Sequence, residues 1–257
     1  MSERFFAVSG RSAVGLQRSG NEDSALLGSS LIAVADGMGG HAGGEVASAL
    51  AINTLAGMSA VLTNTTIDVD SIEDLLLNSL QNVDSEIARV AHDEIELRGM
   101  GTTLSALLLR DQQIALLHIG DSRCYRLRSN VLEQLSHDHT VLQDLLDAGA
   151  ISTSDAHDHP QRSVLTQVLM GEGKIAPVLM VYDVKDKDRY LLCSDGLSAV
   201  LTDKEIKVLL KKNDRDEAVN ALIDATYING APDNVTVVIA DISIDANQES
   251  FVIGAAQ

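Results

Sequence analysis

Short runs of apolar residues, separated by polar turns, divide this chain into segments of two kinds. Apolar residues at helical spacing predict a helix over 45–58 and another over 71–93, in which Ile72, Leu76 and Leu80 fall on one side. Shorter apolar runs between turn residues predict strands. In chain order the predicted elements are strands at 4–9 and 24–35, helices at 45–58 and 71–93, strands at 103–109, 113–119 and 124–128, a helix at 141–148, strands at 178–183 and 189–193, helices near 203–212 and 214–228, and a strand at 235–242.

These elements come in blocks of strands and blocks of helices. Such grouping favours an α+β fold with antiparallel sheets and helices packed outside them. The segment 137–173 interrupts the strand pattern with one helix and a polar stretch. Because no internal repeat or Pro- or Gly-rich linker divides the chain, we expect one domain over 1–242, followed by a weakly ordered C-terminal tail at 243–257.

Composition narrows the possible partners. The 257 residues are 45% hydrophobic, which is enough for a globular core, and the net charge of −18 disfavours binding to nucleic acid or to an anionic membrane. An acidic chain instead suits divalent cations. The sequence shows no signal peptide and no apolar run of membrane-spanning length, so we expect a cytoplasmic, monomeric protein. The two cysteines, Cys124 and Cys193, lie in or beside apolar runs and are expected to be buried.

Aspartates at the ends of predicted strands are the main candidates for chemistry. Asp36 follows the apolar run 31–35 and opens a glycine-rich turn, Asp121 and Asp195 each follow another strand, and Asp233 precedes the last one. Any one of them alone fits a turn residue. Together they indicate a single site lined by oxygen atoms, which suits Mg²⁺ or Mn²⁺ rather than Zn²⁺. Two such ions can share a carboxylate, activate a water and bind a phosphoryl group, to which Arg18 offers a planar guanidinium.

Three other readings of the sequence are weaker. Residues 37–42 fit the glycine-rich dinucleotide fingerprint, but Asp36 would repel the pyrophosphate and the expected acidic residue further along is missing. Two His-Asp-His sequences occur, at 137–139 and 157–159. Their histidines lack the helical spacing of a zinc site and are interpreted as turn or flap residues. No Cys-x5-Arg spacing supports a cysteine-nucleophile phosphatase.

Six motifs occur in the order and spacing of one family. With them the chain resembles the bacterial metal-dependent serine/threonine protein phosphatases of the PPM, or type-2C, family, over about residues 5–242. The resemblance implies a four-layer αββα sandwich, with two antiparallel sheets between layers of helices. It also implies a binuclear Mn²⁺ or Mg²⁺ centre at one end of the sheets. The motifs are Arg18-Ser19-Gly20-Asn21-Glu22-Asp23, Asp36-Gly37-Met38-Gly39-Gly40, Gly101-Thr102-Thr103, Gly120-Asp121-Ser122-Arg123, Ser194-Asp195-Gly196 and Asp233-Asn234.

The resemblance assigns the two tightly bound ions to residues at four positions. By this resemblance Asp36 bridges both ions, and the backbone carbonyl of Gly37 binds one of them. Asp195 and Asp233 bind the second ion. These four residues are therefore expected to meet at one point of the fold.

Further residues are assigned around that centre. Glu22 and Asp23 are expected to contact the ions mostly through water, and Asp121, with help from Asp195, to form a weaker third metal site. Arg18 is expected to bind the substrate phosphate. The segment 137–173 would include a mobile flap beside the active site.

The identity of the general acid is a point of departure from animal members of this family. Those proteins carry a histidine directly after the aspartate-glycine pair, where this chain has Met38, as bacterial relatives usually do. His41 is a candidate general acid, and metal-bound water is the alternative. The implied activity is hydrolysis of phosphoserine and phosphothreonine on proteins, opposing a bacterial Ser/Thr kinase. The alternative is a non-catalytic signalling module that keeps the fold.

Overall fold

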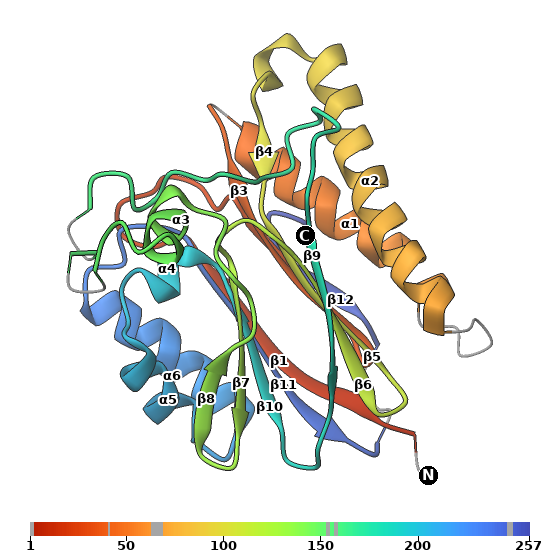
Figure 1. Cartoon of the computed structure of the whole chain (residues 1–257), viewed down its shortest axis with the longest axis vertical. Coiled ribbons are helices and arrows are strands. Elements are labelled where there is room, and N and C mark those ends of the chain that lie inside the picture. The colour runs from red at the N-terminus through yellow and green to blue at the C-terminus, as the bar shows by residue number, and fades with distance from the viewer. Residues whose placement is uncertain (1–2, 41, 63–68, 153–154, 157–158, 246–248) are drawn as a thin grey trace.

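The structure is a computed structural model of the whole chain, and it describes residues 3–40, 42–62, 69–152, 155–156, 159–245 and 249–257. Two β-sheets pack face to face, and helices cover the outer face of each (Figure 1). Every strand pairing in the described residues is antiparallel. The predicted αββα sandwich is therefore confirmed.

Each sheet combines strands that are far apart in sequence. The first sheet has the order β1-β11-β10-β7-β8, and the second has the order β12-β2-β3-β5-β6-β9, with β4 paired to β3. The strands are β1 Phe5–Ala13, β2 Asp23–Leu27, β3 Leu31–Met38, β4 Gly101–Thr102, β5 Leu104–Arg110, β6 Gln113–Ile119, β7 Arg123–Arg128, β8 Val131–Gln134, β9 Val178–Asp183, β10 Arg189–Cys193, β11 Val235–Ser243 and β12 Phe251–Gly254.

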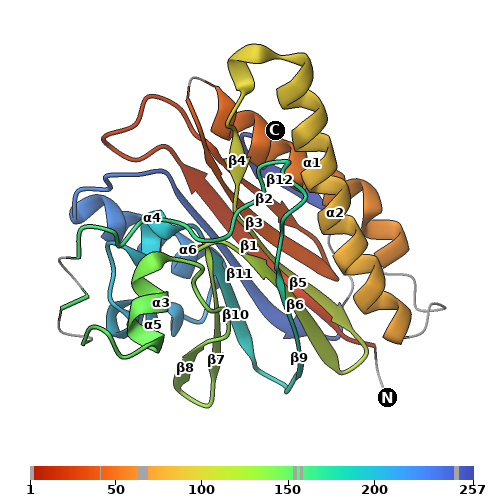
Figure 2. The same ribbon diagram turned by 45° about the horizontal axis from the view of Figure 1, so that its top comes forward.

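The helices form the two outer layers. Helices α1 and α2 cover the second sheet, and α5 and α6 cover the first, as a rotated view also shows (Figure 2). Two of them begin at strong N-caps: Thr202 and Glu205 form a capping box at α5, and Asp214 accepts a hydrogen bond from the backbone of α6. The helices are α1 Gly43–Leu62, α2 Val69–Asp93, a short 3₁₀ helix η1 Ile95–Leu97, α3 Val141–Asp147, α4 Asp195–Ser198, α5 Asp203–Leu210 and α6 Arg215–Ile228.

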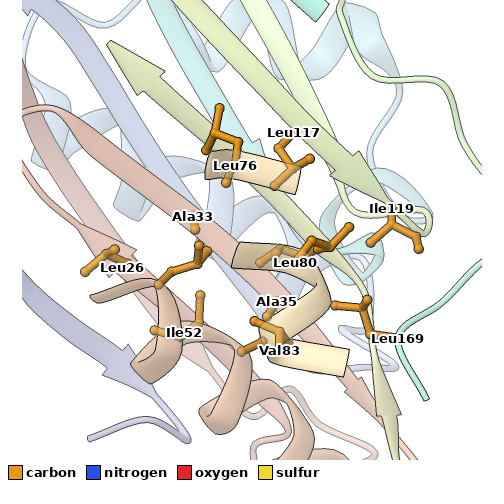
Figure 3. Packing of buried hydrophobic residues seen from close by; sticks show 14 of the residues in the cluster. Leu26, Ala33, Ala35, Ile52, Leu76, Leu80, Val83, Leu117, Ile119 and Leu169 are labelled. Carbon is orange, nitrogen blue, oxygen red and sulfur yellow. The ribbon is translucent and has the colours of Figure 1, made fainter. Parts of the chain in front are cut away.

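Three apolar clusters lie between the four layers. The inner cluster fills the space between the sheets and contains Cys124 and Tyr190, whereas Cys193 lies in the cluster under α5 and α6. Both cysteines are buried and unpaired, as predicted. In the third cluster Ile52 of α1 and Leu80 of α2 pack on the second sheet (Figure 3). Burial of this much apolar surface is the main term that stabilises the sandwich.

Helix α1 has the length and apolar composition of a membrane span, contrary to the expectation that no run approaches it. Its small residues Ala47 and Ala51, with Ile52 and Leu55, are completely buried in the cluster against the second sheet. The apolar character of α1 is thus explained by packing, because α1 contacts both the second sheet and α2.

Three sequence-based predictions need correction. The segment 24–35 is two strands, because a turn at 28–30 separates β2 from β3. The tail at 243–257 is not uniformly weakly ordered: β12 pairs with β2 along Phe251–Gly254. The strand β8 was also missed. It is joined to β7 by a turn in which Ser129 and Asn130 both have positive φ, the geometry of a tight hairpin.

Candidate metal centre and active site

The aspartates predicted to bind metal lie at the ends of elements on one end of the sandwich. Asp23 begins β2 and lies opposite Asp36 of β3 in the strand register. Asp195 begins α4 directly after β10, Asp233 immediately precedes the loop into β11, and Asp121 follows β6. The fold thus brings together carboxylates that are up to 210 residues apart in the sequence.

These five carboxylates lie close enough for their charges to shift one another's pKa values. Burial raises the pKa of Asp23 to about 7, and the charges of Asp195 and Asp233 raise it further. Burial also raises the pKa of Asp121 to about 7, with a contribution from the charge of Asp195. The pKa of Asp36 is raised well above its ordinary value by burial, and then by the charges of the other four aspartates. A cluster of this kind is costly unless protons or cations neutralise it.

The chemistry of this donor set fits hard divalent cations. All of the side-chain donors are carboxylate oxygens, and Asp36 and Asp195 are close enough for their carboxyl groups to share a hydrogen bond. Within the described residues, no three His, Cys, Asp or Glu side chains lie in an arrangement that could hold a metal ion as they stand. The carboxylates therefore form an open cluster in which a cation would relieve the repulsion that raises their pKa values.

The backbone of Asp36 is fixed by the Gly101-Thr102-Thr103 motif. The Thr103 hydroxyl accepts a hydrogen bond from Asp36 N at 3.0 Å, and the Thr102 hydroxyl donates to Asp36 O at 2.9 Å. Thr103 N also donates to Asp36 O at 2.9 Å. Thr103 in turn contacts the Ser122 hydroxyl at 2.7 Å, which links the strand of Asp36 to the loop of Asp121.

A serine next to Asp195 positions Asp23. The Ser194 hydroxyl donates to Asp23 Oδ2 at 2.7 Å and accepts from Thr236 N at 3.0 Å. The hydrogen bonds that Asp23 accepts from the side chains of Ser194 and Thr236 partly oppose the rise in its pKa, because they favour its ionised form. No role for Ser194 was predicted from the sequence, although its place inside the Ser194-Asp195-Gly196 motif could have indicated one.

Asn234 joins two loops of the site and was likewise missed. Its side-chain nitrogen donates to Val14 O at 2.7 Å and to Gly20 O at 2.8 Å, while its side-chain oxygen accepts from Glu22 N at 2.8 Å. One amide side chain thus satisfies three backbone groups of the segment that carries Arg18. This explains why an asparagine follows Asp233.

Arg18 does not extend freely into solvent. Its Nη2 donates to Asp233 Oδ2 at 2.6 Å, and its side chain is 46% exposed. Glu22 lies nearby, and burial raises its pKa while the charge of Arg18 lowers it. The guanidinium is therefore at the rim of the aspartate cluster, where one face remains open to an incoming anion.

Gly37 is closely packed at the rim of the sheet. A Cβ atom there would lie 2.0 Å from Gly44 O, and Gly37 N donates to Glu22 O at 3.1 Å. The strand can turn into α1 at this point only because position 37 has no side chain. His41, the candidate general acid, lies outside the described residues.

The flap segment is joined to the site at both of its ends. Thr102, which bonds to Asp36, forms a bridge with Leu169. Within the flap segment itself, Thr140 forms a bridge with Leu165. His137 bonds to Asp147 of α3 at 2.7 Å, and His139 Nδ1 accepts from Gly120 N at 3.1 Å. The first His-Asp-His pair is thus structural, as interpreted from sequence. His157 and Asp158 of the second pair lie outside the described residues, and His159 is part of a turn.

His118 forms the buried centre of this connection. Its Nδ1 lies 2.8 Å from the Ser105 hydroxyl, its Nε2 lies 2.9 Å from His137 O, and its ring centroid is 5.1 Å from that of His139. Burial lowers the pKa of His118 to about 4; the charge of His139 lowers it further, and that of Asp138 opposes the shift. His118 is therefore neutral at physiological pH.

This shift predicts a pH-dependent contribution to stability. The unfolded chain binds a proton at His118 below about pH 6.5, whereas the folded protein does so only near pH 4, so stability is lost as the pH falls through this window. We expect the gap in unfolding free energy between wild type and His118→Gln to shrink by on the order of 2 kcal/mol from pH 7 to pH 5. Urea unfolding at both pH values measures it, and an unchanged gap would contradict the assignment.

An αββα sandwich with a cluster of aspartates and an arginine at one end of its sheets is the arrangement typical of the PPM class of proteins. The model of the family described as "Protein phosphatase 2C" matches residues 21–227, which is most of the chain. The chain therefore belongs to the protein phosphatase 2C family.

Curated relatives and solved structures agree with this assignment. The chain is 44% identical over 250 residues to the serine/threonine protein phosphatase PstP of Mycobacterium tuberculosis, covering 96% of this chain and 47% of that protein. It is 38% identical to the serine/threonine phosphatase stp of Listeria monocytogenes, covering 82% of this chain and 84% of stp. The catalytic domain of PstP, solved in complex with two manganese ions, matches with a TM-score of 0.84 and 40% identity, over 93% of this chain and 99% of that one. This chain spans about half the length of PstP.

Proposed function

We propose that this chain is a Mn²⁺- or Mg²⁺-dependent protein phosphatase that hydrolyses phosphoserine and phosphothreonine on proteins. One observation supports this most: five aspartates from five separate segments meet beside Arg18 at one end of the sheets. Asp36, Gly37, Asp195 and Asp233 would bind two ions. Asp23 and Glu22 would act mostly through water.

The chain's own residues have distinct parts in this reaction. Bound ions supply an activated water and neutralise the negative charge of the phosphoryl group. Arg18 binds phosphate oxygens from the rim, since its guanidinium offers several parallel donors. Thr102, Thr103 and Ser194 keep the carboxylates oriented through the hydrogen bonds described above.

A direct assay separates this proposal from the alternative of a non-catalytic module. We expect hydrolysis of p-nitrophenyl phosphate and of a phosphothreonine peptide in Mn²⁺, and its loss in EDTA with recovery on adding Mn²⁺ back. Isothermal titration calorimetry of the same protein should detect Mn²⁺ binding. Metal binding without turnover on either substrate would support a signalling module instead.

Replacing Arg18 by alanine is expected to weaken substrate binding. We expect KM for a phosphopeptide to rise about tenfold with a smaller change in kcat, because the phosphate loses its guanidinium while the ion ligands remain. The exposed pair with Asp233 contributes little stability, so the thermal midpoint should barely move. Arg11→Ala, which removes a surface contact to Asn220, serves as the control. Unchanged KM would show that Arg18 serves only the ion pair.

Replacing Asp121 by alanine tests the proposed third, weaker metal site. Its pKa is raised by burial and by Asp195, so it lies within the carboxylate cluster. We expect a fold of wild-type stability, and about a tenfold loss of turnover on phosphopeptides that higher Mn²⁺ partly restores. A Mn²⁺ titration with calorimetric stoichiometry measures this. Wild-type activity across the titration, with a lower thermal midpoint, would identify Asp121 as a turn residue alone.

The partners follow from the proposed reaction. The substrates would be phosphorylated proteins, and a Ser/Thr kinase would supply the phosphate that this chain removes. We also propose that it acts as a monomer in the cytoplasm. Its acidic surface supports the absence of nucleic-acid and anionic-membrane partners.

A further inference from the structure

A cleft of about 380 Å³ opens directly beside the aspartate cluster. Asp121 and Asp195 are among the residues that line it, and so are Leu142 and Leu146 of α3. In both views α3 lies next to α4, the helix that begins at Asp195 (Figures 1 and 2). A substrate phosphate at the aspartates would therefore place its neighbouring residues within reach of this cleft, since one extended residue spans about 3.5 Å.

The apolar wall of the cleft comes from one face of α3. Leu142 and Leu146 are four residues apart, so their side chains lie on the same side of the helix. Both are only partly buried, and α3 contains no fully buried residue. Two leucines at the edge of an acidic site are thus left partly exposed to water, which is unfavourable unless another apolar group covers them.

Two of the charged residues that line the cleft, Arg123 and Asp138, neutralise each other. Arg123 donates from Nε to both oxygens of Asp138 at 3.0 and 2.9 Å, and from Nη2 at 2.7 Å. Gln134 also donates to Asp138, at 2.9 Å. Since this ion pair is satisfied internally, it offers no strong attraction for a charged side chain. Asp121 and Asp195, which also line the cleft, disfavour an acidic side chain.

Helix α3 is held in place by polar contacts at both of its ends. Thr140 caps its N-terminus by accepting from Gln143 N, and Asp147 bonds to both Gln143 and His137. The leucines therefore belong to an anchored wall. They are not part of a segment that would fold inward to bury them.

We infer that this cleft is a specificity subsite that binds an aliphatic side chain within two positions of the phosphorylated residue of the substrate. The inference rests on the proposed phosphatase function and adds a preference among substrates. Leu142 and Leu146 would contact that side chain. The neutralised Arg123–Asp138 pair lines the same cleft.

The test compares phosphothreonine peptides that carry Leu or Ser at each position from −2 to +2. For wild type we expect one position at which Leu gives about tenfold higher kcat/KM than Ser, mainly through KM, because burying a leucine is worth about that factor. In Leu142→Ala and Leu146→Ala the preference should fall to about twofold. Leu146→Met keeps the volume and should retain it.

Leu145→Ala is the matched control. Leu145 is on the same helix and is equally half-buried, but it does not line the cleft, so the preference should persist in this variant. If the wild-type enzyme hydrolyses p-nitrophenyl phosphate but gives the same kcat/KM for the Leu and the Ser peptide at every position, only the subsite is overturned. Equal loss of preference in Leu145→Ala would also overturn it. Absence of any Mn²⁺-dependent hydrolysis would overturn the phosphatase proposal together with the subsite.

Discussion

Asp36→Asn is expected to abolish phosphatase activity while leaving the fold intact. Asp36 is the carboxylate whose pKa is raised by all four of the other aspartates, so it lies at the centre of the cluster. Replacing it would remove the proposed shared ligand of two cations, and turnover in saturating Mn²⁺ should fall to about 1% or less of wild type. The backbone contacts to Thr102 and Thr103 remain available, because they involve only main-chain atoms of Asp36.

The same variant should stabilise the metal-free protein. Removing one buried negative charge relieves repulsion among the remaining carboxylates, which we expect to raise the unfolding free energy in EDTA by on the order of 1 kcal/mol. Asp224→Asn, on the exposed side of α6, is the control and should change neither activity nor stability. Activity above about a tenth of wild type would rule out the bridging role.

Gly196→Ala is expected to be the most disruptive small substitution near the site. A Cβ atom at position 196 would lie 1.8 Å from Asn234 O, a main-chain atom that cannot rotate away. Either α4 or the loop before β11 must move, and these segments carry Asp195 and Asp233. We expect a loss of about 3 kcal/mol or more in unfolding free energy, together with weaker Mn²⁺ binding.

A second glycine provides the control for this substitution. Gly57 is exposed within α1, and a Cβ atom there would meet nothing within 4 Å. Gly57→Ala should therefore raise stability by about 0.5–1 kcal/mol, because alanine favours the helix. Chemical unfolding and calorimetry of both variants test the pair. Wild-type stability and metal affinity in Gly196→Ala would show that the two segments are more adaptable than the close approach indicates.

Long amphipathic patterns predicted their elements well, and short ones did not. Helix α2 was found because its apolar residues repeat over 25 residues. In contrast, β8 and β12 have four residues each, and α4 has four. A run of that length carries too little periodicity to reveal its structure. The strand β12 is defined by its pairing with β2, which lies at the other end of the sequence.

The residues of the candidate site also fall into two groups, those that the sequence predicted and those that it did not. The aspartates were found because each stands next to a recognisable strand or turn. The residues that position them were not, since Ser194 acts on Asp23 and Asn234 acts on Val14 and Gly20 only after folding. Arg18 was expected to contact the phosphate, and its pairing with Asp233 depends on a loop geometry that the sequence does not encode locally.

The position of β1 has a consequence for the order in which this protein can fold. In its sheet β1 is an edge strand whose one neighbour is β11, and Phe5 pairs with Ser243. During synthesis the first strand therefore waits for almost the whole chain before its hydrogen-bond partner leaves the ribosome. Asp23 and Asp36 are made early, whereas Asp233 directly precedes that late strand. The acidic cluster is thus completed only when the sheets close, so a nascent chain carries its excess negative charge without the site that would capture a cation.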